Sequence, residues 1–311
     1  MEQTAEYQTR QEWLKERQKG IGGSDAGAIC GLNPYKSRLA LYLEKIGETK
    51  PVQENEMMYW GNVLEDIVAK EFERRSGLKV REEHKILKSA THPFMIANVD
   101  RLIIGIDEGL ECKTANAYVK EQWTNGKIPD SYMAQIQHYM AVTGYKAWWI
   151  AVLIGGNDFR YQRVERDEEF INMLTELEFD FWFNHVLRGV MPDADGSESS
   201  TTIINQMFPD ADAGSETILN NNVDELIQDY FEYDELAKRY SDLKDEMANK
   251  IKIQIGDKEK GLTSNYIVNW KNCTTNRIDS KKLQMEQPEI YSKYLKPSAY
   301  RKFSIKEIKG E

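Results

Sequence analysis

The sequence of 311 residues lacks several features that mark common protein classes. Its three cysteines, Cys30, Cys112 and Cys273, are far apart and form no CxxC pair, which argues against a disulfide scaffold, a zinc ribbon and an iron–sulfur cluster. There is no run of about 18 apolar residues, so we expect no membrane span. The polar first residues predict no signal peptide. Together these absences predict a protein of the reducing cytoplasm.

Positive charge is also scarce in this chain. It has 41 Lys and Arg against 51 Asp and Glu, a formal net charge of −10. This balance argues against general adhesion to nucleic acid but leaves room for a local basic channel. The segment from Lys271 onward is the exception, with ten basic against five acidic residues. Either a solvated surface or a DNA-facing tail explains that surplus.

Composition divides the chain near residue 192. Before it, helical and strand patterns alternate, whereas 192–215 is rich in Asp, Ser and Gly, which is typical of a linker or surface loop. Apolar spacing over 223–255 predicts a helix whose apolar stripe must bury against something, and alternation over 266–270 predicts a strand. We therefore expect domain limits as follows: a domain at 1–195, a linker or loop at 196–215, and an appendage with a long helix, short strands and a basic tail at 216–311.

The most informative stretch present is GLECKTA at 109–115. On a strand, Glu111 and Lys113 project to one face and Cys112 to the other. Alone, this pattern fits an ion pair on an exposed strand. Asp100, the acid in the apolar run 94–104, adds a second carboxylate, because a hairpin would place it beside Glu111. Two such carboxylates would hold Mg²⁺, with Lys113 orienting or deprotonating a water next to the ion.

A third acid, Glu65, lies in a predicted helix over 60–77 that ends at Gly77. On a helical projection Glu65 falls within the apolar arc that includes Val68 and Phe72. A carboxylate on a buried face is costly unless it is paired or binds metal. A buried salt bridge and a metal ligand are therefore both open interpretations of Glu65.

The glycine-rich segment 19–25, KGIGGSD, precedes a helix that we expect to begin near Ala26. A helix N-terminus favours an anion, but no Gly-Lys-Ser/Thr follows, so the segment is not a nucleotide P-loop. An ordinary capped turn, with Ser24 or Asp25 as N-cap, fits equally well. The histidines show no metal-ligand spacing, and we expect them at the surface or satisfied in the core: His84, His92, His138 and His185.

Taken in order, these residues resemble the PD-(D/E)xK nuclease core. More narrowly, the chain resembles the YqaJ-like viral recombinase family, relatives of phage lambda exonuclease, over about residues 10–190. One departure is that Val99, rather than Pro, precedes Asp100. The landmarks that carry the resemblance are Arg17 with IGGSD at 21–25, GLNPY at 31–35, Gly61-x-x-x-Glu65, Asp100, Glu111-Cys-Lys113 and Tyr132-x-x-Gln135-x-Gln137-His-Tyr139.

The resemblance implies an α/β fold, with a restriction-endonuclease-like mixed central sheet flanked by helices and a C-terminal helical and small β appendage. It also implies site roles. Asp100, Glu111 and the backbone carbonyl of Cys112 would bind Mg²⁺ or Mn²⁺, and Glu65 would complete a two-ion site. Lys113 would position the attacking water, and Gln135 would line the site, although by itself Gln135 fits an ordinary polar helix residue. Arg17 and Ser24 would hold the 5′-phosphate of a DNA end.

The activity implied is that of a metal-dependent 5′→3′ exonuclease. It would degrade double-stranded DNA from its ends and supply 3′ single strands for phage-type recombination by annealing. The implied partners are DNA ends, further copies of the chain in a trimer, and a RecT-type single-strand annealing protein, with no membrane. The setting would be the cytoplasm of a bacterial host, with a phage or prophage origin. A DNA endonuclease, or a nuclease-fold DNA-binding protein that acts through partners, is the alternative.

Overall fold

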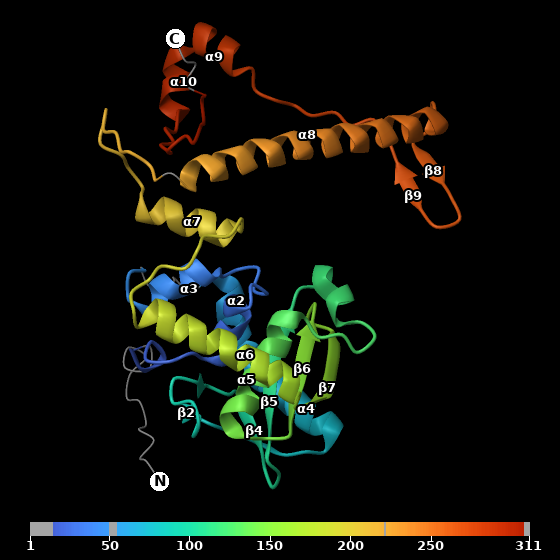
Figure 1. Ribbon diagram of the computed structural model, residues 1–311. Coiled ribbons are helices and arrows are strands. Elements are labelled where there is room, and N and C mark those ends of the chain that lie inside the picture. Colours follow the sequence, from blue (N-terminus) through green and yellow to red (C-terminus); the bar gives the residue numbers. More distant parts are fainter. Residues whose placement is uncertain (1–14, 50–54, 221, 308–311) are drawn as a thin grey trace. The chain divides into compact units, whose positions relative to one another are not determined.

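The structure is a computed structural model that describes residues 15–49, 55–220 and 222–307 (Figure 1). It forms two compact units, Met1–Met207 and Phe208–Glu311. In the described part of the chain, no helix has both the length and the apolar character needed to cross a membrane.

A mixed five-stranded sheet forms the centre of the first unit, in the order β1-β4-β5-β6-β7. Only the β5–β6 pair is parallel; β1–β4, β4–β5 and β6–β7 are antiparallel. A parallel pair requires a long crossover, and here the crossover contains two helical segments. As a result β5, which carries GLECKTA, is the central strand and not an exposed one. The strands are β1 Val80–Glu82, β4 Arg101–Ile103, β5 Glu108–Ala115, β6 Ala147–Ile154 and β7 Asp158–Glu165.

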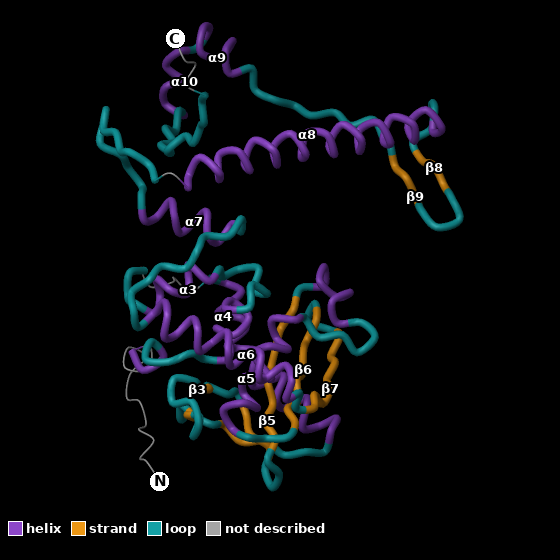
Figure 2. The backbone as a smooth tube through the Cα atoms, viewed as in Figure 1, coloured by secondary structure: helices purple, strands orange, loops and turns teal. Residues whose placement is uncertain are grey.

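Helices cover both faces of this sheet (Figures 1 and 2). On one face, Val68 and Phe72 of α4 pack against Cys112 and Ala151. On the other, α5 contributes Ile136 and Met140 to a core with Ile150 and Val152. Strand alternation puts Glu111 and Lys113 on the α5 side. The helices of this unit are α2 Gly23–Ile29, α3 Arg38–Lys45, α4 Glu56–Ser76, η1 Ala117–Trp123, α5 Asp130–Thr143, α6 Glu168–Asp180, η2 Phe181–Val186 and α7 Glu198–Met207; a small pair, β2 Leu87–Lys88 and β3 Ile96–Ala97, lies beside them.

Helix α4 shows how local sequence sets its limits. The side chain of Asn55 accepts a hydrogen bond from the Met58 N–H at 2.9 Å and caps the start of the helix. Gly77 ends it with φ 76°, a left-handed conformation that glycine adopts without strain. The predicted stop at Gly77 is confirmed, and the helix begins four residues before the predicted Trp60.

The segment expected to be a linker or loop at 196–215 contains helix α7, so the expectation of irregular structure is wrong for 198–207. The serines that suggested a loop act at the helix start: the Ser200 N–H donates to Ser197 Oγ at 3.1 Å. Ser199 Oγ accepts from the Ser37 N–H at 2.9 Å, and Ile203 is buried in the core of the first unit. Serine favours both loops and helix N-caps, and here the buried Ile203 decides between them.

The second unit consists of one long helix with small elements behind it. The expected helix and strand are both present. Ile255 is the only buried residue among those described from Phe208 onward. The elements are α8 Asn222–Ile255, β8 Lys260–Leu262 paired antiparallel with β9 Ile267–Asn269, α9 Ser280–Glu286 and α10 Pro288–Tyr294.

Candidate active site

Glu111 is the centre of the site, on the central strand β5, with 2% of its surface exposed. Its Oε1 accepts hydrogen bonds from Lys113 Nζ at 2.5 Å and from Gln135 Nε2 at 2.7 Å. Its Oε2 is buried and has no hydrogen-bond partner among the described residues. A buried carboxylate oxygen without a partner is costly, so this atom marks a place where a cation would be stabilised.

Asp100 lies beside Glu111, as the predicted hairpin requires. The register pairs Arg101 with Leu110, which sets Asp100 opposite Glu111. Its Oδ2 accepts a hydrogen bond from the Cys112 N–H at 2.8 Å. Burial of the carboxyl, followed by the negative charge of Glu111, raises the pKa of Asp100 to about 7. Two neighbouring carboxylates repel one another when both are ionised, and a bound divalent cation would offset that repulsion.

Lys113 lies between Glu111 and an aromatic ring. Its Nζ is 4.8 Å from the centroid of the Tyr132 ring, a cation–π contact. Burial alone would lower the pKa of Lys113, but the charges of Glu111 and Asp100 outweigh it and raise that pKa. Lys113 is therefore an ammonium here, a group that orients a water by donating hydrogen bonds but is a poor base.

Gln135 and Tyr139, one turn apart on α5, hold Glu111 from the other side. Gln135 Nε2 also donates to Tyr139 Oη at 2.7 Å, and that hydroxyl donates to the Asn98 carbonyl at 2.9 Å. Burial, together with the charges of Glu111 and Asp100, raises the pKa of Tyr139 well above its usual range. Tyr139 belongs to the sequence motif around Gln135, but sequence reasoning assigned it no role; here it anchors Gln135 to the loop before Asp100.

Gly23 is needed for the close packing of Tyr139. A Cβ at residue 23 would lie 2.4 Å from the Tyr139 ring, nearer than real Cβ atoms approach. The glycine-rich segment is fixed as a strand-like partner of 94–96, because the Ile21 N–H donates to the Phe94 carbonyl at 2.7 Å and the Ile96 N–H to the Ile21 carbonyl at 2.8 Å. IGGSD is thus adjacent to the α5 residues of the site.

Glu65 forms the salt bridge that sequence reasoning left open. Its Oε1 is 2.6 Å from Arg101 Nη1, and its side chain is 32% exposed. Burial and the charge of Asp100 raise the pKa of Glu65, which shows that the two acids are close enough to interact. Arg101 was missed by sequence reasoning, although a cation directly after Asp100 in an apolar strand is a visible signal. As a metal ligand, Glu65 stays a prediction.

The donors present fit one hard divalent cation better than two. Within residues 15–49, 55–220 and 222–307, no group of three His, Cys, Asp or Glu side chains is arranged to hold a metal ion. Asp100 and Glu111 do lie opposite one another, and the Glu111 Oε2, which no described residue partners, is an oxygen donor of the kind Mg²⁺ and Mn²⁺ prefer. A second ion would require Glu65 to leave Arg101. The role of the Cys112 carbonyl stays a prediction.

Arg17 and Ser24 lie together, with Arg17 Nη2 donating to Ser24 Oγ at 2.9 Å. Helix α2 begins at Gly23 with Gly22 as N-cap, so the predicted start at Ala26 and the predicted N-caps, Ser24 and Asp25, are wrong. Asp25 caps the helix from its third residue, where its carboxylate accepts the Gly22 N–H at 2.9 Å. Sequence cannot separate these positions, because Ser, Asp and Gly all favour a helix start.

A buried ion pair holds Asp25 away from solvent. Lys45 Nζ is 2.7 Å from Asp25 Oδ2, and both side chains are almost fully buried. Burial would raise the pKa of Asp25, but the charges of Lys45 and then Arg17 hold it well below its usual range. Asp25 is therefore a neutralised structural group, which leaves the exposed Ser24 beside the Arg17 guanidinium.

His138 is a satisfied core residue, one of the two environments expected for the histidines. Its ring nitrogens contact Glu178 Oε1 at 2.8 Å and the Ile96 carbonyl at 2.9 Å. Burial opposes its charge, but Glu178 raises the pKa of His138. It takes no part in the group around Glu111.

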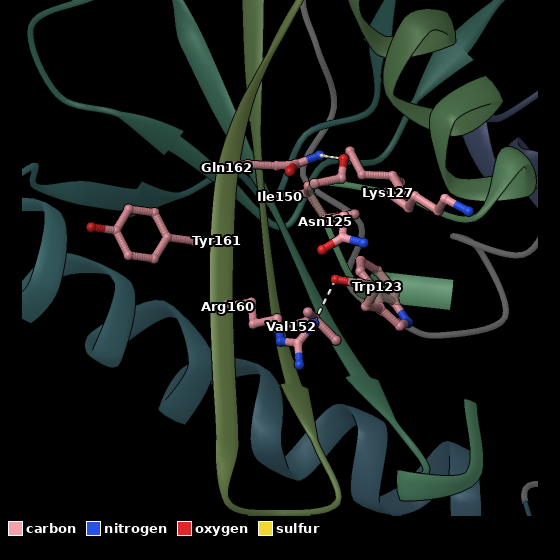
Figure 3. Close-up of a pocket in the computed structure, with 10 residues that line it drawn as sticks. Trp123, Asn125, Lys127, Ile150, Val152, Arg160, Tyr161 and Gln162 are labelled. Carbon is pink, nitrogen blue, oxygen red and sulfur yellow. Dashed lines mark hydrogen bonds between the residues drawn. The ribbon is translucent and has the colours of Figure 1, made fainter. Parts of the chain in front are cut away.

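A cavity of about 240 Å³ lies along the same face of the sheet (Figure 3). Ile150 and Val152 line it, and they are the register partners of Glu111 and Lys113 on the neighbouring strand. Trp123, which also lines it, packs against Tyr132 with the rings tilted by 32° and 5.6 Å between their centroids. Tyr161 points away from the other labelled side chains in Figure 3. Next to the two carboxylates Asp100 and Glu111 (the acid pair), the surface therefore contains a cavity that is partly lined by aromatic side chains.

The fold is α/β, a mixed central sheet flanked by helices, with Glu111 and Lys113 on its central strand β5 and Asp100 directly before β4. A family model described as "YqaJ-like viral recombinase domain" matches residues 12–146. The chain is 43% identical over 304 residues, 96% of this chain and 95% of the relative, to "Uncharacterized protein YqaJ" of Bacillus subtilis (strain 168). It belongs to the YqaJ-like viral recombinase family.

A solved structure shares the fold. The crystal structure of LHK-Exo in complex with dAMP matches with a TM-score of 0.50 and 21% identity, over 58% of this chain and 94% of that one. A second structure is described as an alkaline exonuclease (LHK-Exo) from Laribacter hongkongensis; it matches with a TM-score of 0.48 and 18% identity, over 64% of this chain and 100% of that one.

Proposed function

We propose that the protein is a divalent-metal-dependent exonuclease that degrades double-stranded DNA from its ends in the 5′→3′ direction. The observation that carries the proposal is the buried Oε2 of Glu111, for which the described part of the chain offers no hydrogen-bond partner. Glu111 lies in an acid pair with Asp100, while Lys113 and Gln135 hold its other oxygen. A bound Mg²⁺ or Mn²⁺ would polarise the scissile phosphate and lower the pKa of a water.

The residues of the chain have distinct tasks in this proposal. Asp100 and Glu111 hold the cation, with the Cys112 carbonyl as a third donor. Lys113, kept charged by its acidic neighbours, orients the attacking water. Gln135 fixes the Glu111 carboxylate and lines the site. Glu65 would complete a second ion site once it leaves Arg101, with which it forms a salt bridge here.

The assignment as an exonuclease rests on an anchor for DNA ends. Arg17 and the exposed Ser24 present a guanidinium and a hydroxyl, donors that suit a terminal 5′-phosphate. Gly23, next to Ser24, packs against the ring of Tyr139, and Tyr139 contacts Gln135, so the anchor and the acid pair are near one another. An endonuclease has no use for an anchor of this kind.

The biological setting is proposed from the family. The 3′ single strands produced would enter phage-type recombination by annealing, with a RecT-type protein as partner. We place the protein in the cytoplasm of a bacterial host, with a phage or prophage origin. By family likeness the nuclease units would assemble as a trimer.

Digestion of end-labelled linear duplex, compared with closed circular duplex in the presence of Mg²⁺, tests the proposal. We expect the linear substrate to be degraded and the circle to survive, with no reaction after chelation of the metal. Rapid cutting of circles would favour the endonuclease. Binding of both substrates without cleavage would favour a DNA-binding protein that acts through partners.

The end anchor has its own test. Linear duplex with a 5′-phosphate should be degraded faster than duplex with a 5′-hydroxyl, and Arg17→Ala should remove that preference. Lys19→Ala is the matched control, since Lys19 is a neighbouring cation that pairs with Glu16. Equal rates for both substrates with the unaltered protein would refute the anchor but leave the acid-pair assignment intact.

A further inference from the structure

Helix α8 carries a regular apolar seam along most of its length. Spacings of four and three alternate from Leu226 to Ile251, close to four heptads, which is the repeat of a two-stranded coiled coil. The central tyrosines of the seam are well exposed, Tyr233 at 63% and Tyr240 at 67%. The seam positions are Leu226, Tyr230, Tyr233, Ala237, Tyr240, Lys244, Met247 and Ile251.

The second unit itself covers little of this seam. Its hairpin contacts the end of the helix, where Ile255 packs near Gly261. Near the start of the helix, Tyr230 meets the Phe303 ring with 6.0 Å between centroids. Between these ends α8 extends as one straight element of its unit, about 50 Å long at 1.5 Å per residue (Figure 1). A helix of 34 residues with an exposed stripe of this length requires a partner helix.

The distribution of charge along α8 indicates which helix can pair with it and in which direction that helix runs. Residues 222–237 contain six acidic and no basic side chains, whereas residues 238–255 contain five basic and three acidic ones. A second copy running in the opposite direction would set each acidic half against a basic half. A parallel copy would place acidic half beside acidic half. Six acids without a base also make the first half a poor surface for DNA phosphates.

The side chains agree with one antiparallel register. If Ala237 of one copy faces Tyr240 of the other, then Leu226 faces Ile251 and Tyr230 faces Met247 in the same register. At the centre of the seam the small Ala237 then packs against the large Tyr240, and this match in size lets the two helices come into close contact. The polar seam residue, Lys244, then faces a Tyr233 ring, which suits an ammonium and its stem. In a parallel pair Lys244 would face Lys244 of the other copy, and two like charges would meet in the seam.

The positions that flank the seam fit the same register. Asp229 of one copy lies opposite Lys250 of the other, and Leu236 lies opposite Leu243. We propose that α8 pairs with α8 of a second copy of this chain as an antiparallel two-stranded coiled coil. Such a pair has a two-fold axis, so it joins copies two at a time, whatever contact the nuclease units make. The inference concerns assembly and does not depend on the proposed nuclease activity.

Cross-linking at the two ends of the seam tests the register. Full-length Leu226→Cys and Ile251→Cys chains, with different tags, are coexpressed with Cys273, the exposed native cysteine, changed to Ser. A short thiol-reactive cross-linker should join the two differently tagged chains. Neither variant expressed alone should link to itself, because equal residues lie about 37 Å apart in an antiparallel pair.

The outcomes of this experiment are distinct. Self-linking of Leu226→Cys alone would mean a parallel pair and would overturn the proposal. The absence of any link between chains would overturn it too. A link within one chain between α8 and the first unit would show that the seam is covered by its own chain, which would also refute the pairing.

Solution mass provides a second measurement. Tyr240→Glu places a charge at the centre of the seam and should halve the mass of the full-length protein. Ile253→Glu is the matched control, since Ile253 is 77% exposed and outside the seam, and it should leave the mass unchanged. If Tyr240→Glu instead lowers DNA affinity at constant mass, the seam binds DNA and the pairing is refuted.

A charge exchange makes the test specific for orientation. Asp229→Lys alone and Lys250→Asp alone should each weaken pairing about three- to tenfold, because each sets like charges opposite one another. Both changes in one chain should restore pairing, since the antiparallel register then again sets opposite charges against each other at these two positions. A doubly changed chain weaker than either single variant would contradict the register.

Discussion

The two units of the chain use charge in opposite ways. The first unit buries ion pairs: Asp25 with Lys45, His138 with Glu178, and Glu111 with Lys113. In the second unit the ion pairs lie on the surface, as Lys250 with Glu246 does. Buried charges persist only when neighbours fix them, so a unit that contains them must be rigid and well packed. The first unit therefore forms the candidate active site from its own buried charges, whereas the second unit presents an exposed, charged surface to a partner.

Removing the central acid should have the largest effect. Glu111→Gln keeps the size of the side chain but removes the charge that holds the cation and Lys113. We expect the cleavage rate on linear duplex to fall by at least about 10³-fold, while circular dichroism shows a folded protein. Glu246→Gln in the second unit is the matched control and should cleave at the unaltered rate. Cleavage by Glu111→Gln within about tenfold of that rate would show that the site is elsewhere.

Breaking a buried pair should cost far more stability than breaking an exposed one. Lys45→Met leaves Asp25 buried without its cation and also removes hydrogen bonds to the Arg17 and Gly20 carbonyls. We expect the free energy of unfolding to fall by about 3–5 kcal/mol, measured by urea denaturation. Lys282→Met, which breaks the exposed pair with Glu286 in the second unit, should change it by less than about 0.5 kcal/mol. Similar losses in both variants would remove the contrast between the units.

The same pair gives a pH signature. The folded pKa of Asp25 is depressed, so its contribution is present above the unfolded pKa of about 4 and is lost as pH falls toward the lower folded value. In Lys45→Met the largest charge that lowers the pKa of Asp25 is gone, so burial is opposed only by the charges of Arg17 and Lys36, and acid relieves more of the penalty. The stability difference between the two proteins should therefore be largest near neutral pH and shrink below about pH 4. A difference independent of pH would show that Lys45 acts through packing.

Adding one methyl group at a glycine should also lower stability more in the first unit than in the second. A Cβ at Gly109 would lie 2.1 Å from the Trp148 ring, whereas one at Gly261 would lie 3.2 Å from the Ile255 side chain, which can move. We expect Gly109→Ala to cost about 1–3 kcal/mol or more, and Gly261→Ala less than about 1 kcal/mol. Thermal unfolding of the two variants measures both. A harmless Gly109→Ala would mean that the sheet is looser than described.

Removing the second unit should have the smallest effect on the stability of the first. The hydrophobic clusters of the first unit contain no described residue beyond Met207. We expect a chain that ends at Met207 to stay soluble, with a melting temperature within a few degrees of the first transition of the full protein. An insoluble product would show that the second unit covers core surface.

Local rules predicted the part of the site that lies on one hairpin. Strand alternation placed Glu111 and Lys113 on one face, and the turn between two strands brought Asp100 beside them. The stop at Gly77 and the long α8 follow from equally local signals. These features depend on residues close in sequence, so periodicity and turn chemistry are enough to find them.

Contacts between distant segments were not predictable in the same way. Arg101 pairs with Glu65 on a helix 36 residues earlier, and Tyr139 meets Gly23 across the unit. The start of α2 depended on which of several good capping residues the tertiary structure uses, and α7 depended on where Ile203 finds a core. Propensity alone cannot choose between such alternatives, because burial decides them.

Direct measurement of metal binding tests the central claim, that Asp100 and Glu111 form a cation site. Calorimetric titration of Mn²⁺ into the full-length protein should show saturable binding, and Glu111→Gln should weaken it at least about tenfold with the fold intact. Glu246→Gln should bind Mn²⁺ as the unaltered protein does. Equal binding by the unaltered protein and Glu111→Gln, or no binding by either, would contradict the account.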